Sequence, residues 1–293
     1  MCAERVTKAK PGEVETTGHS WDGIEEFNNP LPRWWLYSFY ACILYALVYT
    51  ILYPAWPMLT RATPGVLGAS TRADVVEEIA RFDAALAPIK AKLVAADLTA
   101  IPADAELSSY AISAGASVFR TNCSTCHGSG AAGVKASGYP NLLDDDWLWG
   151  GDIEAIHLTI THGIRNTADP DARYSLMPAF GVDELLDDTQ IGQVTEYVLQ
   201  VSGQEHDAAL ATEGSAIYAE NCASCHGEQA EGNRELGAPK LSDAIWLYGG
   251  DRDAITYTIV NARAGVMPPW APRLSEDEIR SVAAYVHALG GGE

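Results

Sequence analysis

Residues 122–130 read NCSTCHGSG and residues 221–229 read NCASCHGEQ, so one Cys-x-x-Cys-His pattern occurs twice. The similarity extends outward from both copies. GASVFRTNCSTCHG (115–128) matches GSAIYAENCASCHG (214–227), and YPNLLDDDWLWGGD (139–152) matches APKLSDAIWLYGGD (238–251). The first copy then has nine extra residues before MPAF (177–180) matches MPPW (267–270). Repeats of this length predict two small domains, at residues 108–203 and 207–291.

The repeated pattern is compatible with three kinds of site. Two thiols followed by a histidine are typical of c-type haem attachment, in which the thiols hold the haem and the histidine binds its iron. A structural zinc site needs four protein ligands, and each repeat has one cysteine pair and no suitably spaced histidine pair. A redox Cys-x-x-Cys usually accompanies a βαβ pattern, which is not evident here. The sequence therefore favours two covalently bound haem c groups, on Cys123, Cys126, Cys222 and Cys225.

Each haem iron needs axial ligands. His127 and His226 directly follow the paired cysteines and supply the first ligand of each iron. Met177 and Met267 stand at equivalent places in the repeats, each in a Met-Pro sequence. A thioether is a suitable second ligand, and Met/His ligation raises the reduction potential of a haem. We therefore predict His and Met ligation at both irons.

His162 is a rival ligand in the first repeat, and His157 is a weaker one. Both align with non-histidine residues of the second repeat, which favours a structural role for them. The carbonyl groups of Pro140 and Pro239, in the loop after each motif, are placed to accept a hydrogen bond from the axial histidine and orient its ring.

Helices are expected at both ends of each repeat. The last helices are predicted at 188–201 and 276–289, the second with a capping box formed by Ser275 and Glu278. Gly115 and Gly214 lie on the first helices, where a glycine lets another helix cross closely while aromatic rings fill the space around it. The architecture is therefore expected to be all-α.

Residues 34–53 read WWLYSFYACILYALVYTILY, without charge, proline or glycine. A helix of this length is roughly 30 Å long and matches the hydrocarbon core of a bilayer, so we predict a single transmembrane helix. Basic residues are more numerous before it than after it, which places residues 1–33 in the cytoplasm. The residues concerned are Arg5, Lys8, Lys10 and Arg33 before the span, and Arg61 and Arg72 after it.

Residues 54–107 are predicted to be a linker with a helical stalk. Apolar residues follow helical spacing over 74–96, with Thr71 as the expected cap and Pro88 expected to kink or divide the helix. The whole chain carries 39 acidic and 19 basic residues, a net charge of −20. Such a chain repels nucleic acid and suits a basic protein partner.

The order of helix, Cys-x-x-Cys-His, proline loop, Met-Pro and last helix resembles class I cytochrome c, and the resemblance covers residues 108–290. The stretch HSWDGIEEFNNPLPRWWL (19–36), one span and two such domains together resemble subunit III of the cbb3-type cytochrome c oxidases. The resemblance implies one transmembrane helix followed by two tandem class I cytochrome c domains. It also implies the inner membrane of a bacterium, with the haem domains in the periplasm.

The same resemblance implies an electron-transfer subunit without substrate chemistry of its own. Its partners would be a soluble or membrane cytochrome c donor, a monohaem subunit and the oxygen-reducing catalytic subunit. The region from Ser108 carries 26 acidic and 10 basic residues, a net charge of −16, which would attract a basic cytochrome. Maintaining solubility is an equally good explanation of that charge.

Two other functions remain open from the sequence. A free-standing dihaem cytochrome, serving a quinol-oxidising complex or a dehydrogenase, would need only a membrane anchor and would not explain the segment before the span. A dihaem peroxidase would need one haem with an open site for peroxide, and the two intact Met-Pro sequences argue against that.

Overall fold

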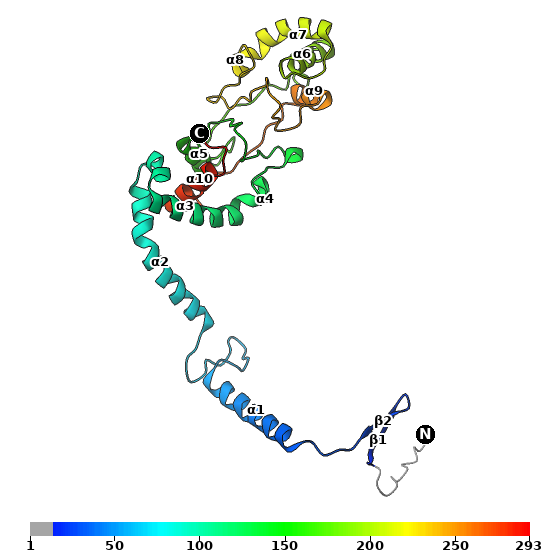
Figure 1. The fold of residues 1–293 in the computed structure, drawn as a ribbon, viewed down its shortest axis with the longest axis vertical. Helices are drawn as coiled ribbons and strands as arrows, with labels where there is room; N and C mark the ends of the chain where they lie inside the picture. Colours follow the sequence, from blue (N-terminus) through cyan, green and yellow to red (C-terminus); the bar gives the residue numbers. More distant parts are fainter. Residues whose placement is uncertain (1–13) are drawn as a thin grey trace. The chain divides into compact units, whose positions relative to one another are not determined.

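The computed structural model describes residues 14–293, which are mostly helical (Figure 1). Its N-terminal part contains an antiparallel hairpin of β1 (Thr16–Trp21) and β2 (Ile24–Phe27). Asp22 and Gly23 make the turn with φ values of 53° and 84°, as an Asp-Gly hairpin turn requires. The sequence analysis did not predict this hairpin. Arg5, Lys8 and Lys10, used above to orient the span, lie outside the described residues.

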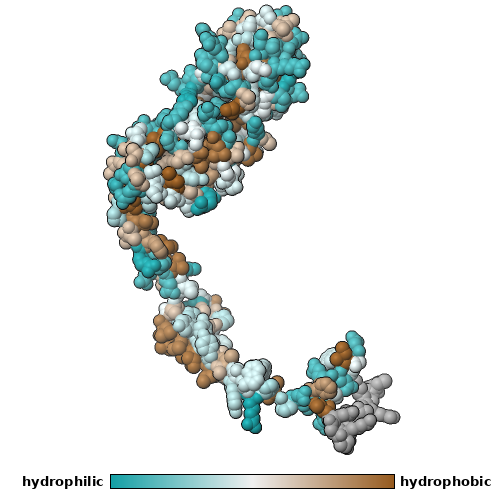
Figure 2. Space-filling view, in the orientation of Figure 1, coloured by the Kyte–Doolittle hydropathy of each residue, from teal (hydrophilic) through white to brown (hydrophobic). Residues whose placement is uncertain are grey.

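The predicted membrane span forms one helix, α1 (Arg33–Leu52), with no buried residue. It is the only helix in residues 14–293 that is long and apolar enough to cross a bilayer. Figure 2 shows apolar side chains along its exposed surface. The aromatic rings of Tyr49 and Tyr53 stack at its C-terminal end, 4.8 Å apart, where aromatic residues favour the membrane interface.

The stalk helix α2 (Thr71–Ala95) differs from its prediction in two respects. Pro88 was predicted to kink or divide it, and it does not divide it; a proline removes one backbone hydrogen bond, and the bonds on either side can carry the helix through. Its side-chain cap is Ser70 and not Thr71, because the hydroxyl of Ser70 accepts the N–H of Ala73 at 3.3 Å. The chain divides into two units, residues 1–83 and 84–293.

The second unit holds both repeats. Each contributes a long helix before its motif, a short helix containing it, a middle helix and a last helix. In the first repeat these are α3 (Ala105–Val118), α4 (Ser124–His127), α5 (Ile153–His162) and α6 (Asp188–Val201). In the second they are α7 (Ala208–Asn221), α8 (Ala223–His226), α9 (Arg252–Asn261) and α10 (Glu276–His287). Three short turns complete the set: η1 (Leu98–Ala103), the π-helical η2 (Phe119–Cys123) and η3 (Lys135–Ser137).

Aspartates cap many of these helices. Their carboxylates accept backbone N–H groups of the first turn, which a helix cannot satisfy internally. The capping aspartates are Asp104, Asp152, Asp187, Asp207 and Asp251, and Ser275 and Glu278 form the predicted capping box of α10. Part of the acidic surplus of this region therefore serves the fold itself.

The two repeats exchange their C-terminal halves. Helix α3 of the first repeat packs against α10 of the second, and α6 of the first packs against α7 of the second. Figure 1 shows the same pairs, with red α10 beside green α3 and green α6 beside yellow α7. We call residues 105–164 with 267–289 the first lobe, and residues 177–201 with 208–261 the second lobe. The predicted boundaries 108–203 and 207–291 follow the sequence repeats, whereas the packing follows these lobes.

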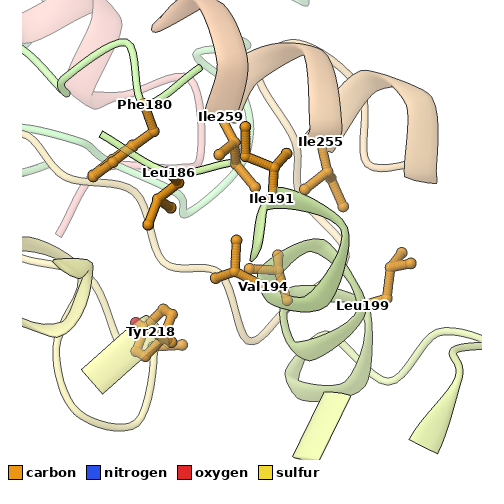
Figure 3. Packing of buried hydrophobic residues seen from close by; sticks show 10 residues of the cluster. Phe180, Leu186, Ile191, Val194, Leu199, Tyr218, Ile255 and Ile259 are labelled. Carbon is orange, nitrogen blue, oxygen red and sulfur yellow. The ribbon is translucent and has the colours of Figure 1, made fainter. Parts of the chain in front are cut away.

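Each lobe has its own hydrophobic core drawn from both repeats. In the second lobe, Ile191 and Val194 of α6 pack with Tyr218 of α7 and with Ile255 and Ile259 of α9. Figure 3 shows these side chains converging from their separate helices. In the first lobe, Phe119, Ile156 and Ile160 pack with Ile279 and Val282 of α10. Neither core would be complete in a single repeat.

The repeated glycines are the sites where the helices cross. A Cβ at Gly115 on α3 would overlap the carbonyl oxygen of Ser281 on α10. A Cβ at Gly214 on α7 would overlap the carbonyl oxygen of Gln193 on α6. Aromatic pairs close each crossing, Phe119 with Tyr285 at 5.4 Å and Tyr197 with Tyr218 at 5.0 Å. The predicted glycine and aromatic packing is present, and it joins opposite repeats.

Replacing Gly115 by Ala is expected to destabilise the chain by about 1–3 kcal/mol, because the added methyl group overpacks a backbone carbonyl. Gly192 on α6 is the matched control, since nothing lies within 4 Å of its added Cβ. Gly192→Ala should stabilise the chain by up to about 1 kcal/mol through helix propensity. Thermal unfolding followed by circular dichroism measures both, and equal midpoints for the two variants would contradict the close crossing.

Candidate haem sites

Both motifs are presented by a short helix that follows a long one. Helix α3 widens into the π-turn η2, which ends at Cys123, and α4 then carries Cys126 and His127 within one turn. In the second repeat α7 ends at Asn221, and α8 carries the corresponding residues. Gly128 and Gly227 end these short helices with φ of 81° and 83°. The two thiols and the imidazole of each motif thus lie within a few residues of one another, as attachment to one flat cofactor requires.

The two motif histidines lie against the predicted proline carbonyls. The Nδ1 atom of His226 lies 2.9 Å from the carbonyl oxygen of Pro239, and that of His127 lies 3.4 Å from the carbonyl oxygen of Pro140. With Nδ1 as the donor, Nε2 keeps its lone pair for a metal. Burial lowers the pKa of His127 and of His226, and the bonded carbonyls oppose this shift. Burial therefore favours the neutral imidazole that binds iron.

The first cysteine of each motif is also shielded from water. Burial raises the pKa of the Cys123 thiol and of the Cys222 thiol to about 11. Neither thiol is in a disulfide in the described chain. A thiol with so high a pKa is a weak nucleophile toward disulfides at neutral pH, which counts against a redox dithiol at either motif.

Each predicted methionine ligand lies beside the motif of the opposite repeat. Met267 lines one cavity together with Cys123 and His127. Its backbone pairs with Ile164 of the first repeat through two hydrogen bonds of 3.0 Å. Met177 and Cys222 both pack against the core of the second lobe. The arrangement therefore brings together His127 with Met267, and groups Met177 with the second motif.

The loop that carries Met177 is held by the second repeat in the same way. The N–H of Phe180 donates to the carbonyl oxygen of Ile259 at 3.1 Å, and the N–H of Val182 donates to that of Val260 at 3.1 Å. An ion pair adds to this connection, because the half-exposed Arg252 of α9 donates to the buried Glu196 of α6 at 2.6 Å. Glu196 also accepts the N–H of Asp207 at 2.7 Å, and the hydrogen bond from Arg252 lowers its pKa.

The cavity of the first lobe fits a haem. Its walls are mainly apolar, and Cys123, His127 and Met267 all line it. The apolar lining includes Phe119, Leu142, Trp147, Ile156, Ile160, Val282 and Val286. Trp149 also lines it, and its Nε1 is buried without a hydrogen-bond partner among the described residues, as is the nearby Nε of Arg173. Two buried donors without acceptors match the carboxylates of haem propionates.

The structure places the rival histidines in other contacts. His162 Nδ1 lies 3.0 Å from Asp169 of the nine-residue insertion, and His157 Nε2 lies 3.2 Å from Glu276. Neither lines the cavity that contains His127 and Met267. Within residues 14–293, the one cluster of three possible metal ligands is His162 with Asp169 and Asp171, and it includes no residue of either motif. A zinc site with several protein ligands is therefore not built around either cysteine pair.

Sequence reasoning missed the exchange between repeats and the buried donors of Trp149 and Arg173 that lack a partner. A signal for the exchange was present, because only six residues join α6 to α7 (residues 202–207). So short a connection favours antiparallel packing of the two helices it joins. For Trp149 and Arg173 the repeat offered a weaker signal, since Tyr248 and Arg263 stand at the matching places and also form a cation–π pair, at 4.7 Å.

Comparison with known proteins agrees with this architecture. A family model described as cytochrome c oxidase, cbb3-type, subunit III matches residues 111–198 and 209–286. A second, described as the N-terminal domain of cytochrome oxidase-cbb3, FixP, matches residues 13–60. These matches cover the two repeats, the hairpin and the membrane span.

Relatives are similar over nearly their whole length. The cbb3-type cytochrome c oxidase subunit CcoP of Cereibacter sphaeroides is 67% identical over 289 residues, covering 99% of each chain. The subunit CcoP of Rhodobacter capsulatus is 57% identical over 96% of this chain and 97% of its own. The subunit FixP of Rhizobium meliloti is 50% identical over 96% of each chain. The motifs, the two lobes and these similarities together establish that the chain belongs to the subunit III family of the cbb3-type cytochrome c oxidases.

Proposed function

We propose that this electron-transfer subunit carries two covalent haem c groups with crossed axial ligation. Cys123 and Cys126 would hold one group, whose iron would be bound by His127 and Met267. Cys222 and Cys225 would hold the other, whose iron would be bound by His226 and Met177. A haem c iron supplies one-electron chemistry by alternating between its ferric and ferrous states. The observation that carries the proposal is the shared cavity of Cys123, His127 and Met267.

The residues around each site would hold the iron ligands in place and keep water away from the haem. The proline carbonyls keep the imidazole rings oriented, and the backbone bonds at Ile164 and Phe180 hold the methionine loops in place. Apolar side chains exclude water, which together with the thioether ligand favours the ferrous state and a high potential. With a histidine and a methionine bound to each iron, neither site would offer an open iron position to a substrate.

We further propose that the lobes are periplasmic and the N-terminus is cytoplasmic. Arg33 at the start of α1, with the basic residues before it, supports this orientation. Electrons would enter from a soluble or membrane-bound cytochrome c and leave through a monohaem subunit toward the oxygen-reducing subunit. The acidic surface of the lobes, with a net charge of −16 from Ser108 onward, supports a basic donor.

Gentle purification of the tagged chain from its native membranes tests the assembly. A reduced-minus-oxidised spectrum should contain haem c and haem b, and reduced cytochrome c should support oxygen uptake by the same sample. Haem c alone from an intact preparation would instead support a free-standing membrane cytochrome.

Replacing Cys222 and Cys225 together by Ser should remove one of two covalent haems, because the attachment bonds need both thiols. The haem content per chain, measured by the pyridine haemochrome spectrum and by mass spectrometry, should fall from two to about one. Insertion of α1 into the membrane should not change, since the motif and α1 lie in different units. Cys42→Ser is the control and should retain both haems; retention of both in the double variant would contradict the assignment.

A further inference from the structure

Trp149 connects the first haem cavity to the loop after the second motif. Its ring lines the cavity that contains His127 and Met267, and the residue is 8% exposed. On its other side the ring packs directly on Gly237, where an added Cβ would overlap the six-membered part of the indole. Gly237 has a φ of 58°, so both its backbone conformation and the ring above it call for glycine.

Gly237 is two residues from the group that orients the second axial histidine. The chain continues through Ala238 to Pro239, whose carbonyl oxygen lies 2.9 Å from Nδ1 of His226. A short path of van der Waals contact, backbone and one hydrogen bond thus leads from the first haem cavity to the imidazole of the second site.

The matching aromatic residue of the second repeat makes the same contact with the loop after the first motif. Tyr248 aligns with Trp149 in the sequence repeat, and its ring packs on Gly138, which has a φ of 68°. Gly138 is followed by Tyr139 and Pro140, whose carbonyl oxygen lies 3.4 Å from Nδ1 of His127. The guanidinium of Arg263 lies 4.7 Å from the centroid of the Tyr248 ring and holds it in place.

We propose that Trp149 and Tyr248 are the two bridges through which electrons pass between the haem sites. With a haem at each site, one electron would pass from the ferrous iron of one site to the ferric iron of the other. No bond forms or breaks, no proton moves, and neither ring changes its oxidation state. The proposal rests on the function proposed above and adds the residues that couple its two sites.

The bridges also explain why a large aromatic residue of one loop faces a glycine of the other loop. An aromatic ring of one haem loop needs a glycine of the other loop beneath it, and the repeat supplies both at Trp149 with Gly237 and at Tyr248 with Gly138. A smaller side chain at either aromatic position would leave a gap at the contact, where electronic coupling through the protein is weakest.

Flash reduction of the full chain in detergent tests the proposal. A Met177→His background lowers the potential of one haem and makes the two spectrally distinct, whichever iron this methionine binds. In that background, Trp149→Leu and Tyr248→Leu should each slow electron exchange between the haems, and the double variant should slow it by roughly tenfold, equivalent to ~1.4 kcal/mol of activation free energy. Trp149→Phe and Tyr248→Phe keep a ring on the glycine and should restore most of the rate.

Haem content and both reduction potentials are measured on every variant, which separates this proposal from the function it rests on. An unchanged exchange rate in the double variant, with two haems and unchanged potentials, would overturn the bridges while leaving haem binding intact. If one leucine variant loses its haem, the rate of electron exchange in the other single variant tests the proposal. A chain without two covalent haems in the wild type would instead contradict the proposed function.

Discussion

Replacing Met267 by His is expected to lower the reduction potential of the haem at Cys123 and Cys126, the motif of the opposite repeat. Met267 shares a cavity with Cys123 and His127, and its backbone is bonded to Ile164 of that repeat. Changing Met/His to bis-His ligation should lower the potential by roughly 0.1–0.3 V, a fraction of the ~0.8 V range that axial ligands cover. The haem at Cys222 and Cys225 should stay close to its original potential.

Variants with a single haem make this assignment decisive. In a chain with Cys222→Ser and Cys225→Ser, only the first haem remains, and Met267→His should shift its potential. In a chain with Cys123→Ser and Cys126→Ser, the same substitution should have little effect, whereas Met177→His should shift the remaining haem. Potentiometric titration in the visible region measures all of these.

Met58→His is the matched control, because this methionine lies in the first unit and is 64% exposed. It should leave both potentials unchanged. The opposite pattern, in which Met267 affects only the haem of its own repeat, would show that ligation follows the sequence repeats and that the crossed arrangement is wrong.

Local features of the fold were predictable because local chemistry determines them. The span, the last helices and the capping box of α10 were predicted within about two residues, from uncharged length, apolar spacing and a Ser-x-x-Glu signature. The orientation of His226 by Pro239 was also predicted, since both lie in one loop. Each of these features depends on residues close together in the chain.

The exchange between repeats could not be derived from the same signals. Gly115 and Gly214 occupy equivalent places on the first helices, and Tyr197 and Tyr285 do so on the last helices. The first helix could therefore cross the last helix of its own repeat or that of the other repeat with the same glycine contact and the same aromatic pair. The choice depends on connection lengths and on the packing of the whole lobe, which no short stretch of sequence expresses.

The N-terminal hairpin was missed for a different reason. Its strands are exposed on both faces, so they lack the alternation of apolar and polar residues that marks a half-buried strand. The Asp22-Gly23 turn was the available signal, and it predicts a hairpin independently of burial.

Cutting the chain between α6 and α7 is expected to leave its two halves firmly associated. A protease site inserted after Gly203, where nothing lies within 4 Å of an added Cβ, allows the cut to be made in the folded protein. Each lobe contains helices from both halves, so separating the halves would expose both cores at once. The cut chain should elute as one species with the absorption spectrum of the intact chain, and separate only in denaturant.

The first half alone should behave differently, because it lacks α10 and Met267. Residues 84–203, produced by themselves with haem attached, should lose Met ligation at Cys123 and Cys126 completely, which removes the far-red absorption band of the ferric form. Adding the second half should restore that band, since Met267 returns with the helix that packs on Gly115. Two independent side-by-side domains would give the opposite results: a normally ligated first half, and a cut chain that separates into two stable halves without denaturant.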